Sequence, residues 1–308
     1  MARSYRFFLR NKATSVHLPE GENILREAEE PEIFYQLTKV LRVKNADEVR
    51  FGGIQQTVSG FSLVEDSVEN LAGVRCFFDF LYQIEEIRKK EIHLRFEKKI
   101  MNSNELGMAL KVVLCLPNRP DKLEFIVQKS VELGVRNIFL VKSDFSQMKH
   151  DLRAERLQKI MMEAAEQSER AVVPSLHFED QLDFSNPQND LSRKHSSSQT
   201  PVLKNFLEKT ATNSPQKLST LWTAMERSNE KETLSLPSLL QKNKQLPELS
   251  LLIGPEGGFS PQEKELIQKL NITCFSLGRR ILRMETAAIV AIGIVGQYLE
   301  TKQNQDKK

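Results

Sequence analysis

The chain has 308 residues, of which 40% are apolar and 28% are charged, and its formal net charge is +3. This length is typical of two domains, and no apolar run approaches the roughly 20 residues that a membrane-spanning helix needs. Cys76, Cys115 and Cys274 form no C-x-x-C pair, and the five histidines show no ligand spacing. We therefore expect a cytoplasmic protein with no membrane span, no disulfide framework and no metal site.

The first hundred residues are predicted to form a small β-barrel or sandwich. Tyr5, Phe7 and Leu9 alternate with Arg6, Phe8 and Arg10, the period of two of a half-buried strand. Residues 40–64 contain short β-branched runs broken by turn residues. The charged segment from about residue 85 to 106 is ambiguous, and we place a boundary near its end. The predicted domains are 1–105 and 106–303, followed by a polar tail, 304–308.

After this boundary the pattern becomes that of a β-α-β unit. Leu110–Leu116 and Asn137–Val141 are continuously apolar runs, and Asp121–Leu133 between them has helical spacing. Gly134 stands where a glycine commonly ends a helix. Strands that are apolar throughout favour a parallel sheet covered on both faces.

The middle of the second domain is less regular. Asp151–Arg170 is predicted to be a helix, and Leu218–Met225 a strand. Residues 180–216 are rich in Ser, Asn, Gln and Pro, and we interpret them as a variable surface loop with one short amphipathic helix around Pro201–Lys209.

Two strands near the end of the chain stop at glycines. Leu249–Ile253 ends at Gly254, and Ile272–Leu277 ends at Gly278. Ser260, with Pro261 and Glu263 after it, predicts a capped helix running to about Leu270. In an open parallel sheet such strand ends lie on the carboxyl edge, where ligands bind, and glycine permits close approach of a ligand. A simple tight turn is the alternative for this Gly-Pro-Glu-Gly-Gly stretch.

The residues around these glycines narrow the ligand chemistry. The G-x-G-x-x-G fingerprint of a dinucleotide site is absent. The carboxylate of Glu256 disfavours a phosphate at the following helix and suits a cation such as a sulfonium. Arg279, Arg280 and Arg283 are suited to phosphate contacts on a polyanion, although a solvated basic loop is the alternative. The last helix, from Thr286 to Leu299, is apolar nearly all round and is interpreted either as core or as a dimer interface.

Four stretches in order resemble the RsmE family of ribosomal RNA methyltransferases, in the SPOUT superfamily. They are FIVQKSVELGV (125–135), EAAEQSER (163–170) with Val173-Pro174, LLIGPEGGFS (251–260) and LGRRILRMETAA (277–288). YRFF (5–8) and LTKVLRVKNADEVRF (37–51) are weaker matches. The chain departs from the family at Arg279, usually proline, at Met284, usually threonine, and at Asn45-Ala46, where a turn glycine is customary.

The resemblance implies an α/β fold: a C-terminal SPOUT-type parallel sheet with a trefoil knot, plus a small N-terminal PUA-like β-barrel that binds RNA. It also implies a homodimer that methylates N3 of one uridine in the decoding region of 16S rRNA, in the small ribosomal subunit. The implied cofactor is S-adenosylmethionine, held by Ile253, Gly254, Pro255, Glu256, Gly257, Gly258, Leu277, Gly278, Ile281, Leu282, Thr286 and Ala287. The residues expected to contact RNA are Arg6, Arg10, Arg42, Arg170, Arg279 and Arg280.

Uridine N3 must lose its proton to become a nucleophile, so a site for it needs charge stabilisation, with or without a general base. We assign Arg283 to the uracil oxygen or an adjacent phosphate. Glu285 is either a base or a carboxylate favoured by the helix dipole. Glu163, Glu166, Gln167 and Arg170 are predicted to form a polar wall of the site. The alternatives are a SPOUT enzyme acting on tRNA or a ribose 2′-hydroxyl, a non-catalytic ribosome-assembly protein, and, more remotely, a phosphate-binding module.

Overall fold

The computed structural model describes residues 4–8, 23–57, 60–63, 77–148, 152–178, 202–225, 233–243, 246 and 248–306. They pack as two compact units. Unit 1 comprises Met1–Glu105 and Ala165–Val173, and unit 2 comprises Leu106–Ala164 and Pro174–Lys308. The segment Ala165–Val173 therefore packs with the first unit, although it contains the end of a helix that begins in the second.

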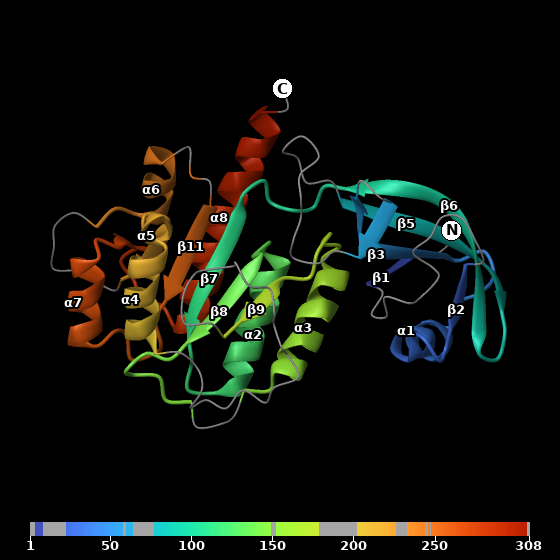
Figure 1. Ribbon diagram of the computed structural model, residues 1–308, viewed down its shortest axis with the longest axis horizontal. Helices are drawn as coiled ribbons and strands as arrows, with labels where there is room; N and C mark the ends of the chain where they lie inside the picture. The colour runs from blue at the N-terminus through green and yellow to red at the C-terminus, as the bar shows by residue number, and fades with distance from the viewer. Residues whose placement is uncertain are drawn as a thin grey trace. The chain divides into compact units, whose positions relative to one another are not determined.

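Unit 1 is built on one mixed sheet. Its strands are β1 (Ser4–Phe8), β2 (Ile24–Arg26), β3 (Glu48–Thr57), β4 (Gly60–Leu63), β5 (Phe77–Ile87) and β6 (Glu91–Asn102). The order is β1-β3-β5-β6-β2, with β4 paired to β3, and β1 runs parallel to β3 while the other pairs are antiparallel. The long strands β5 and β6 curve (Figure 1), and their register shifts twice, as bulges allow. This curled sheet is consistent with the predicted barrel.

The core of unit 1 lies between this sheet and a short helical segment. Helix α1 (Pro31–Tyr35) continues into a π-helical turn, η2 (Gln36–Val40). Ile33 and Leu37 from these turns are fully buried with aromatic residues of β3 and β5, among them Phe51 and Tyr82. The ambiguous segment at 85–106 proves to contain β6, the longest strand described, in which no charged residue is buried.

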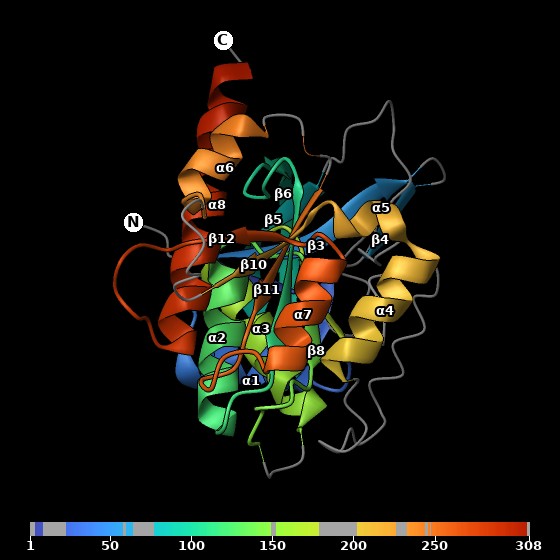
Figure 2. The same cartoon turned by 90° about the vertical axis from the view of Figure 1, so that its left-hand side faces the viewer.

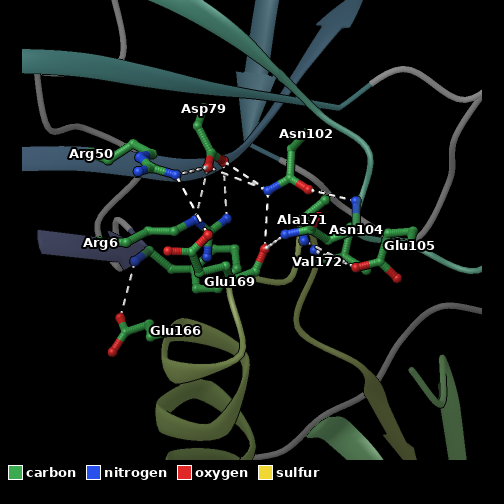
Figure 3. Close-up of polar contacts among 11 residues, drawn as sticks. Arg6, Arg50, Asp79, Asn102, Asn104, Glu105, Glu166, Glu169, Ala171 and Val172 are labelled. Carbon is green, nitrogen blue, oxygen red and sulfur yellow. Dashed lines mark hydrogen bonds and ion pairs between the residues drawn. The ribbon is translucent and has the colours of Figure 1, made fainter. Parts of the chain in front are cut away.

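Arg6 is buried, which corrects the expectation that it faces outward from its strand. Its guanidinium donates to both carboxylate oxygens of Asp79 at 2.9 and 3.0 Å, and the two side chains are 4% and 2% exposed (Figure 3). A Cβ at Gly52 would lie 2.0 Å from the Arg6 guanidinium, so only glycine admits this pair. The strand alternation is also wrong in detail, since Phe7 and Phe8 are both buried.

The segment after α3 is held to unit 1 by a second buried ion pair. Arg170 donates to both oxygens of Glu105, and the backbone N–H groups of Ala171 and Val172 donate to the same carboxylate (Figure 3). Asn102 donates to the carbonyl of Glu169 at 3.2 Å. These contacts explain why Ala165–Val173 packs with the first hundred residues.

Unit 2 is built on a fully parallel sheet, as predicted. Its strands are β7 (Ala109–Cys115), β8 (Asn137–Val141), β9 (Ser175–His177), β10 (Leu221–Ala224), β11 (Glu248–Ile253) and β12 (Thr273–Phe275). Their order is β12-β10-β11-β7-β8-β9, and every pair is parallel. β7 and β11 lie at the centre and are almost wholly buried.

Helices cover both faces of this sheet. They are α2 (Pro120–Glu132), α3 (Ala154–Gln167), α4 (Leu203–Asn213), α5 (Pro215–Leu218), α6 (Leu236–Lys242), α7 (Pro261–Lys269) and α8 (Met284–Asp306). Figure 2 shows α2 and α8 on one side of the sheet and α4 and α7 on the other. α2 ends as predicted, with Gly134 at a φ of +89°. No helix in the described ranges is both long and apolar enough to cross a membrane.

The helix α4 contributes buried side chains to the core of unit 2. Leu203, Phe206 and Leu207 are fully buried in one cluster with β7, β8 and α7. The predicted short amphipathic helix around residues 201–209 is confirmed as α4, and its apolar face is part of the core. Residues 180–201 lie outside the described residues. β9 and α6 were not predicted, because three strand residues and two helical turns give too little periodicity.

The ion pair of Arg6 and Asp79 yields a test of stability. Asp79→Ala leaves a buried guanidinium without its carboxylate, and such a loss costs about 3–5 kcal/mol. We expect the free energy of unfolding of unit 1, measured by urea titration of Tyr82 and neighbouring aromatic signals, to fall by about that amount. The control is Glu85→Ala on the same strand: Glu85 is 52% exposed, so its loss should cost less than about 1 kcal/mol. Equal costs for the two variants would contradict this assignment.

Candidate active site

A pocket of about 540 Å³ lies at the carboxyl edge of the parallel sheet of unit 2. Three strand ends contribute to it: Ala224 and Met225 after β10, the loop from Gly254 after β11, and the loop from Leu277 after β12. The start of α2 and the first turn of α8 complete the wall. This is the edge of an open parallel sheet at which ligands bind.

The loop after β11 holds the backbone close to the pocket. The N–H of Gly258 donates to the carbonyl of Pro255 at 2.9 Å, and Gly258 has a φ of +71°. A Cβ at Gly258 would meet nothing within 4 Å, so the glycine is required by its backbone conformation and leaves open space before it. At Gly254, in contrast, a Cβ would lie 3.0 Å from the ring of Phe259. Phe259, which is 5% exposed, therefore packs directly on the loop.

The carboxylate of Glu256 is fixed by donors from the segment that leads into α2. The Nζ of Lys122 donates at 2.8 Å, and the backbone N–H of Asn118 donates at 3.2 Å. Burial works to raise the pKa of Glu256, but the hydrogen bonds from Lys122 and backbone N–H groups outweigh it and hold the pKa below its usual 4.5. Glu256 thus ties the loop to α2, a role that the sequence did not indicate when it was read as a partner for a cation.

The loop after β12 presents its basic residues to solvent. Gly278 has a φ of +114° and open space where a Cβ would stand, and its N–H donates to the Oγ of Ser276 at 3.1 Å. Arg279, Arg280 and Arg283 are exposed, and within the described ranges none of them forms an ion pair. Basic side chains without a carboxylate partner, at the mouth of a pocket, are available to an anionic ligand.

Glu285 lies in the first turn of α8 and lines the same pocket. Its Oε2 atom is buried and has no hydrogen-bond partner in the described part of the chain. Arg119 is within its electrostatic reach, since the pKa of Arg119 is raised first by Asp121 and, to a smaller extent, by the charge of Glu285. A buried carboxylate oxygen without a donor costs free energy, so this atom is placed to accept a hydrogen bond from a ligand.

The structure gathers nearly all the predicted pocket residues. Those that line it are Ile253, Gly254, Pro255, Glu256, Gly257, Gly258, Leu277, Gly278, Arg279, Arg280, Ile281, Leu282, Arg283, Glu285 and Ala287. Thr286 does not line it and is exposed. The residues that sequence reasoning missed are Asn118, Lys122, Ala224, Met225, Phe259, Lys264 and Met284. No local pattern marks Asn118 and Lys122, which reach the pocket only through the fold.

The residues predicted to bind RNA fall into four groups. Arg279 and Arg280 are exposed and line the pocket. Arg6 and Arg170 are buried in ion pairs with Asp79 and Glu105, so we withdraw them from any RNA surface. Arg10 lies outside the described residues. Arg42 is exposed, with a φ of +51°.

The predicted polar wall does not form at the pocket, because Glu163, Glu166, Gln167 and Arg170 do not line it. Glu166 instead accepts a hydrogen bond from the backbone N–H of Phe8 at 3.0 Å.

The described side chains offer neither a metal centre nor an activated thiol. Within the described ranges, no three His, Cys, Asp or Glu side chains are grouped so that they could hold a metal ion. Cys115, at the end of β7, is buried, and this burial raises the pKa of its thiol well above the usual value. It therefore stays a neutral core residue.

The chain matches a known family. The sequence model of the RNA methyltransferase domain matches residues 104–296, which span the parallel sheet and the pocket described above. This range is more than half of the chain, and the chain therefore belongs to the RNA methyltransferase family.

Similar proteins with a curated name agree on the branch of this family. The ribosomal RNA small subunit methyltransferase E of Rickettsia conorii is 27% identical over 72% of this chain and 79% of its own length. The protein of that name from Mesomycoplasma hyopneumoniae is 34% identical over 62% of this chain and 71% of its own length. The predicted membership of the RsmE family is confirmed.

Solved structures support the fold. A ribosomal RNA small subunit methyltransferase E from Neisseria gonorrhoeae, bound to S-adenosyl methionine, is 21% identical, with a TM-score of 0.63 over 96% of this chain and 98% of that one. A putative methyltransferase from Legionella pneumophila, solved in complex with the cofactor SAM, has the same TM-score at 22% identity and the same coverage.

The contact of Lys122 with Glu256 yields a test by titration. Lys122→Ala removes the strongest donor to the carboxylate, so the charged form loses support and the pKa of Glu256 should rise toward or above 4.5. Because the folded-state pKa is lowered in the native protein, the stability from this contact is present above about pH 4.5 and is lost as pH falls through the folded value. Carbon-13 NMR of the Glu256 carboxyl measures its pKa, and urea unfolding at several pH values measures the stability. Lys264→Ala, which changes a pocket lysine not bonded to Glu256, is the control, and an equal shift there would contradict the assignment.

Proposed function

We propose that this protein transfers a methyl group from S-adenosylmethionine to N3 of a uridine in the decoding region of 16S rRNA. The observation that carries this proposal is the pocket itself: two glycine-bearing loops at the carboxyl edge of a parallel sheet, with three arginines at the mouth that form no ion pair within the described ranges. Membership of the RNA methyltransferase family supports the reaction type, and the names of the relatives support the RNA.

The residues of the pocket fit S-adenosylmethionine. The open space before Gly258 and Gly278 lets a polar ligand approach the backbone. Oε2 of Glu285, to which no residue of the described ranges donates, offers an acceptor to a ligand donor. Ile253, Leu277 and Leu282 supply apolar walls. The residues that would hold the cofactor are the two loops, 253–258 and 277–282, with Ala287 of α8. When bound, S-adenosylmethionine supplies an electrophilic methyl group on a positively charged sulfur.

The rest of the chemistry belongs to the chain. The target nitrogen carries a proton between two carbonyl groups, and its removal leaves negative charge on the uracil oxygens. Arg283 is placed at the mouth of the pocket to stabilise that charge or an adjacent phosphate, and Oε2 of Glu285 is the acceptor placed to take the proton. Glu285 lines the pocket, and no described residue donates a hydrogen bond to its Oε2, which supports this role over a purely helix-dipole one.

The charge of the pocket suits an RNA substrate. Its lining includes five basic side chains, of Lys122, Lys264, Arg279, Arg280 and Arg283, against the two acidic ones of Glu256 and Glu285. Lys122 is already paired with Glu256. The excess positive charge therefore lies in the three arginines and Lys264, where it favours association with a polyanion.

Four further features remain part of the proposal. They are the trefoil knot, a PUA-like barrel in unit 1 that binds RNA with Arg42 among its contacts, a homodimer, and residence in the cytoplasm. The curled sheet of unit 1 and the apolar character of α8 are compatible with the second and third of these.

Small ribosomal subunits from a strain that lacks this gene provide the test. Incubated with the purified protein and S-adenosylmethionine, their rRNA should gain one 3-methyluridine, seen by mass mapping of nucleosides. A methylated ribose, or methylation of tRNA in place of the subunit, would replace the proposed substrate with one of the alternatives. RNA binding without saturable cofactor binding would indicate a non-catalytic protein.

Arg283→Ala tests the arginine at the mouth. Loss of a charge-stabilising donor typically lowers the rate of the chemical step by about 10²–10³-fold, so we expect single-turnover methylation at saturating cofactor to slow by about that factor. Lys269→Ala, at the exposed end of α7 and away from the pocket, should leave the rate unchanged. An unchanged rate for Arg283→Ala would remove this residue from the mechanism.

Glu285→Gln separates the two roles of the carboxylate. If Glu285 accepts the proton, the amide should slow single-turnover methylation by about 10²-fold or more, and a rise in pH should partly restore the rate by deprotonating the uridine in solution. If it only complements the helix dipole, the variant should lose about 0.3–1 kcal/mol of stability with an unchanged rate. Thermal unfolding and the pH–rate profile measure both outcomes.

A further inference from the structure

Glu263 is a buried carboxylate that does not line the pocket, and its contacts exceed those of a helix cap. It stands at the third position of α7 and is 0% exposed. The capping box accounts for two hydrogen bonds: the N–H of Ser260 donates to Glu263 at 2.8 Å, and the N–H of Glu263 donates to the Oγ of Ser260 at 3.2 Å. A box of this kind is complete without burial or further partners.

Two additional donors reach Glu263 from a loop more than a hundred residues earlier in the chain. The Oγ of Ser143 donates to Oε2 at 2.9 Å, and the backbone N–H of Asp144 donates to Oε1 at 2.9 Å. The carboxylate therefore receives three donors from two loops, which offsets the cost of burying its charge. The carboxylate of Glu263 therefore joins the loop after β8 to the beginning of α7.

Asp144 also joins the loop after β8 to α7, but here the carboxylate belongs to the loop and the donor to the beginning of the helix. Its carboxylate accepts a hydrogen bond from the Oγ of Ser260, and it pairs with the Nζ of Lys204 on α4 at 3.0 Å. Hydrogen bonds from Ser260 and Lys204 lower the pKa of Asp144 below its usual value. The loop after β8 is thus connected to α7 and to α4 by two carboxylates.

The loop 143–146 packs directly against Gly257 in the pocket loop. A Cβ at Gly257 would lie 3.1 Å from the Cβ of Phe145, the residue that follows Asp144. The loop 143–146 is itself closed, because the N–H of Ser146 donates to the carbonyl of Ser143 and the Oγ of Ser146 accepts from the N–H of Ser143. None of Ser143, Asp144, Phe145 and Glu263 lines the pocket, so any effect of theirs on a ligand passes through the loop 254–260.

We propose that Glu263 is a positioning residue for the pocket, which fixes the loop 254–260 against the loop 143–146. The far end of the same loop is held by Glu256 on Lys122 and Asn118, so that both ends are anchored while the glycines between them face the open space. The inference rests on the proposed function only for the identity of the ligand, S-adenosylmethionine.

The amide variant Glu263→Gln disrupts this arrangement for a stereochemical reason. Both oxygens of Glu263 face a backbone N–H, of Asp144 on one side and of Ser260 on the other. An amide has only one acceptor oxygen, so in either orientation its NH₂ group faces an N–H donor. The loop must then move away from one of its anchors.

Binding of S-adenosylmethionine, measured by calorimetry, provides the first readout. We expect Glu263→Gln to raise the Kd about tenfold, equivalent to ~1.4 kcal/mol, and to raise KM for the cofactor while kcat at saturation changes less than about threefold. Glu265→Gln, at an exposed position two residues further along α7, is the matched control and should bind normally. If Glu263 has a purely structural role, Glu263→Gln should lower the melting temperature, but the Kd measured well below that temperature should be unchanged.

Hydrogen–deuterium exchange of the ligand-free protein provides a readout that needs no cofactor. Peptides covering residues 252–262 should exchange faster in Glu263→Gln than in the native protein, while those of β7 and β8 stay protected. If Glu263→Gln does not fold, Ser143→Ala, which removes one neutral donor, should show smaller changes of the same kind. A folded variant with native exchange over 252–262 and a native Kd would overturn the inference. A native protein that does not bind S-adenosylmethionine would overturn the proposed function, and the exchange would still decide on Glu263.

Discussion

The carboxyl ends of β10, β11 and β12 meet at one edge of a fully parallel sheet, and the site depends on that arrangement. Parallel strands cannot be joined by tight turns, so each strand end passes into a loop that leads to a helix. Here the loops at 254–260 and 277–283 lead to α7 and α8. The pocket is therefore made of backbone more than of side chains, and glycines at positive φ keep it open.

Backbone loops of this kind need anchors, and two carboxylates, one partly exposed and one buried, supply them. Glu256 accepts from Lys122 and from a backbone N–H, while Glu263 accepts from Ser143 and from two backbone N–H groups. Each carboxylate has its donors within the fold, and its charge is thereby balanced locally. Oε2 of Glu285 differs from both, since no described residue donates to it.

Local sequence signals were sufficient for the elements that form the pocket but not for the contacts that hold it. The apolar runs of β7, β8 and β11, the serine cap of α7 and Gly134 after α2 are each encoded within a few residues, and the structure contains them. Lys122 with Glu256, and Ser143 with Glu263, are separated by more than a hundred residues, and no periodicity records such pairs. The same limit explains why Arg170, in a stretch that carries the family resemblance, was placed at the site although it pairs with Glu105.

Whether an arginine of this chain is available to a ligand therefore depends on whether the fold pairs it with a carboxylate. Arg6 and Arg170 have the residue type of an RNA contact, but Asp79 and Glu105 bury them in unit 1, where their loss would leave an uncompensated charge. Arg279, Arg280 and Arg283 have the same residue type and no carboxylate partner in the described part of the chain. A guanidinium that has no carboxylate partner can turn toward a phosphate without first breaking an ion pair, whereas a paired one must break its ion pair. For this reason the arginines at the mouth of the pocket, and not Arg6 or Arg170, are the ones to which we assign the proposed RNA contacts.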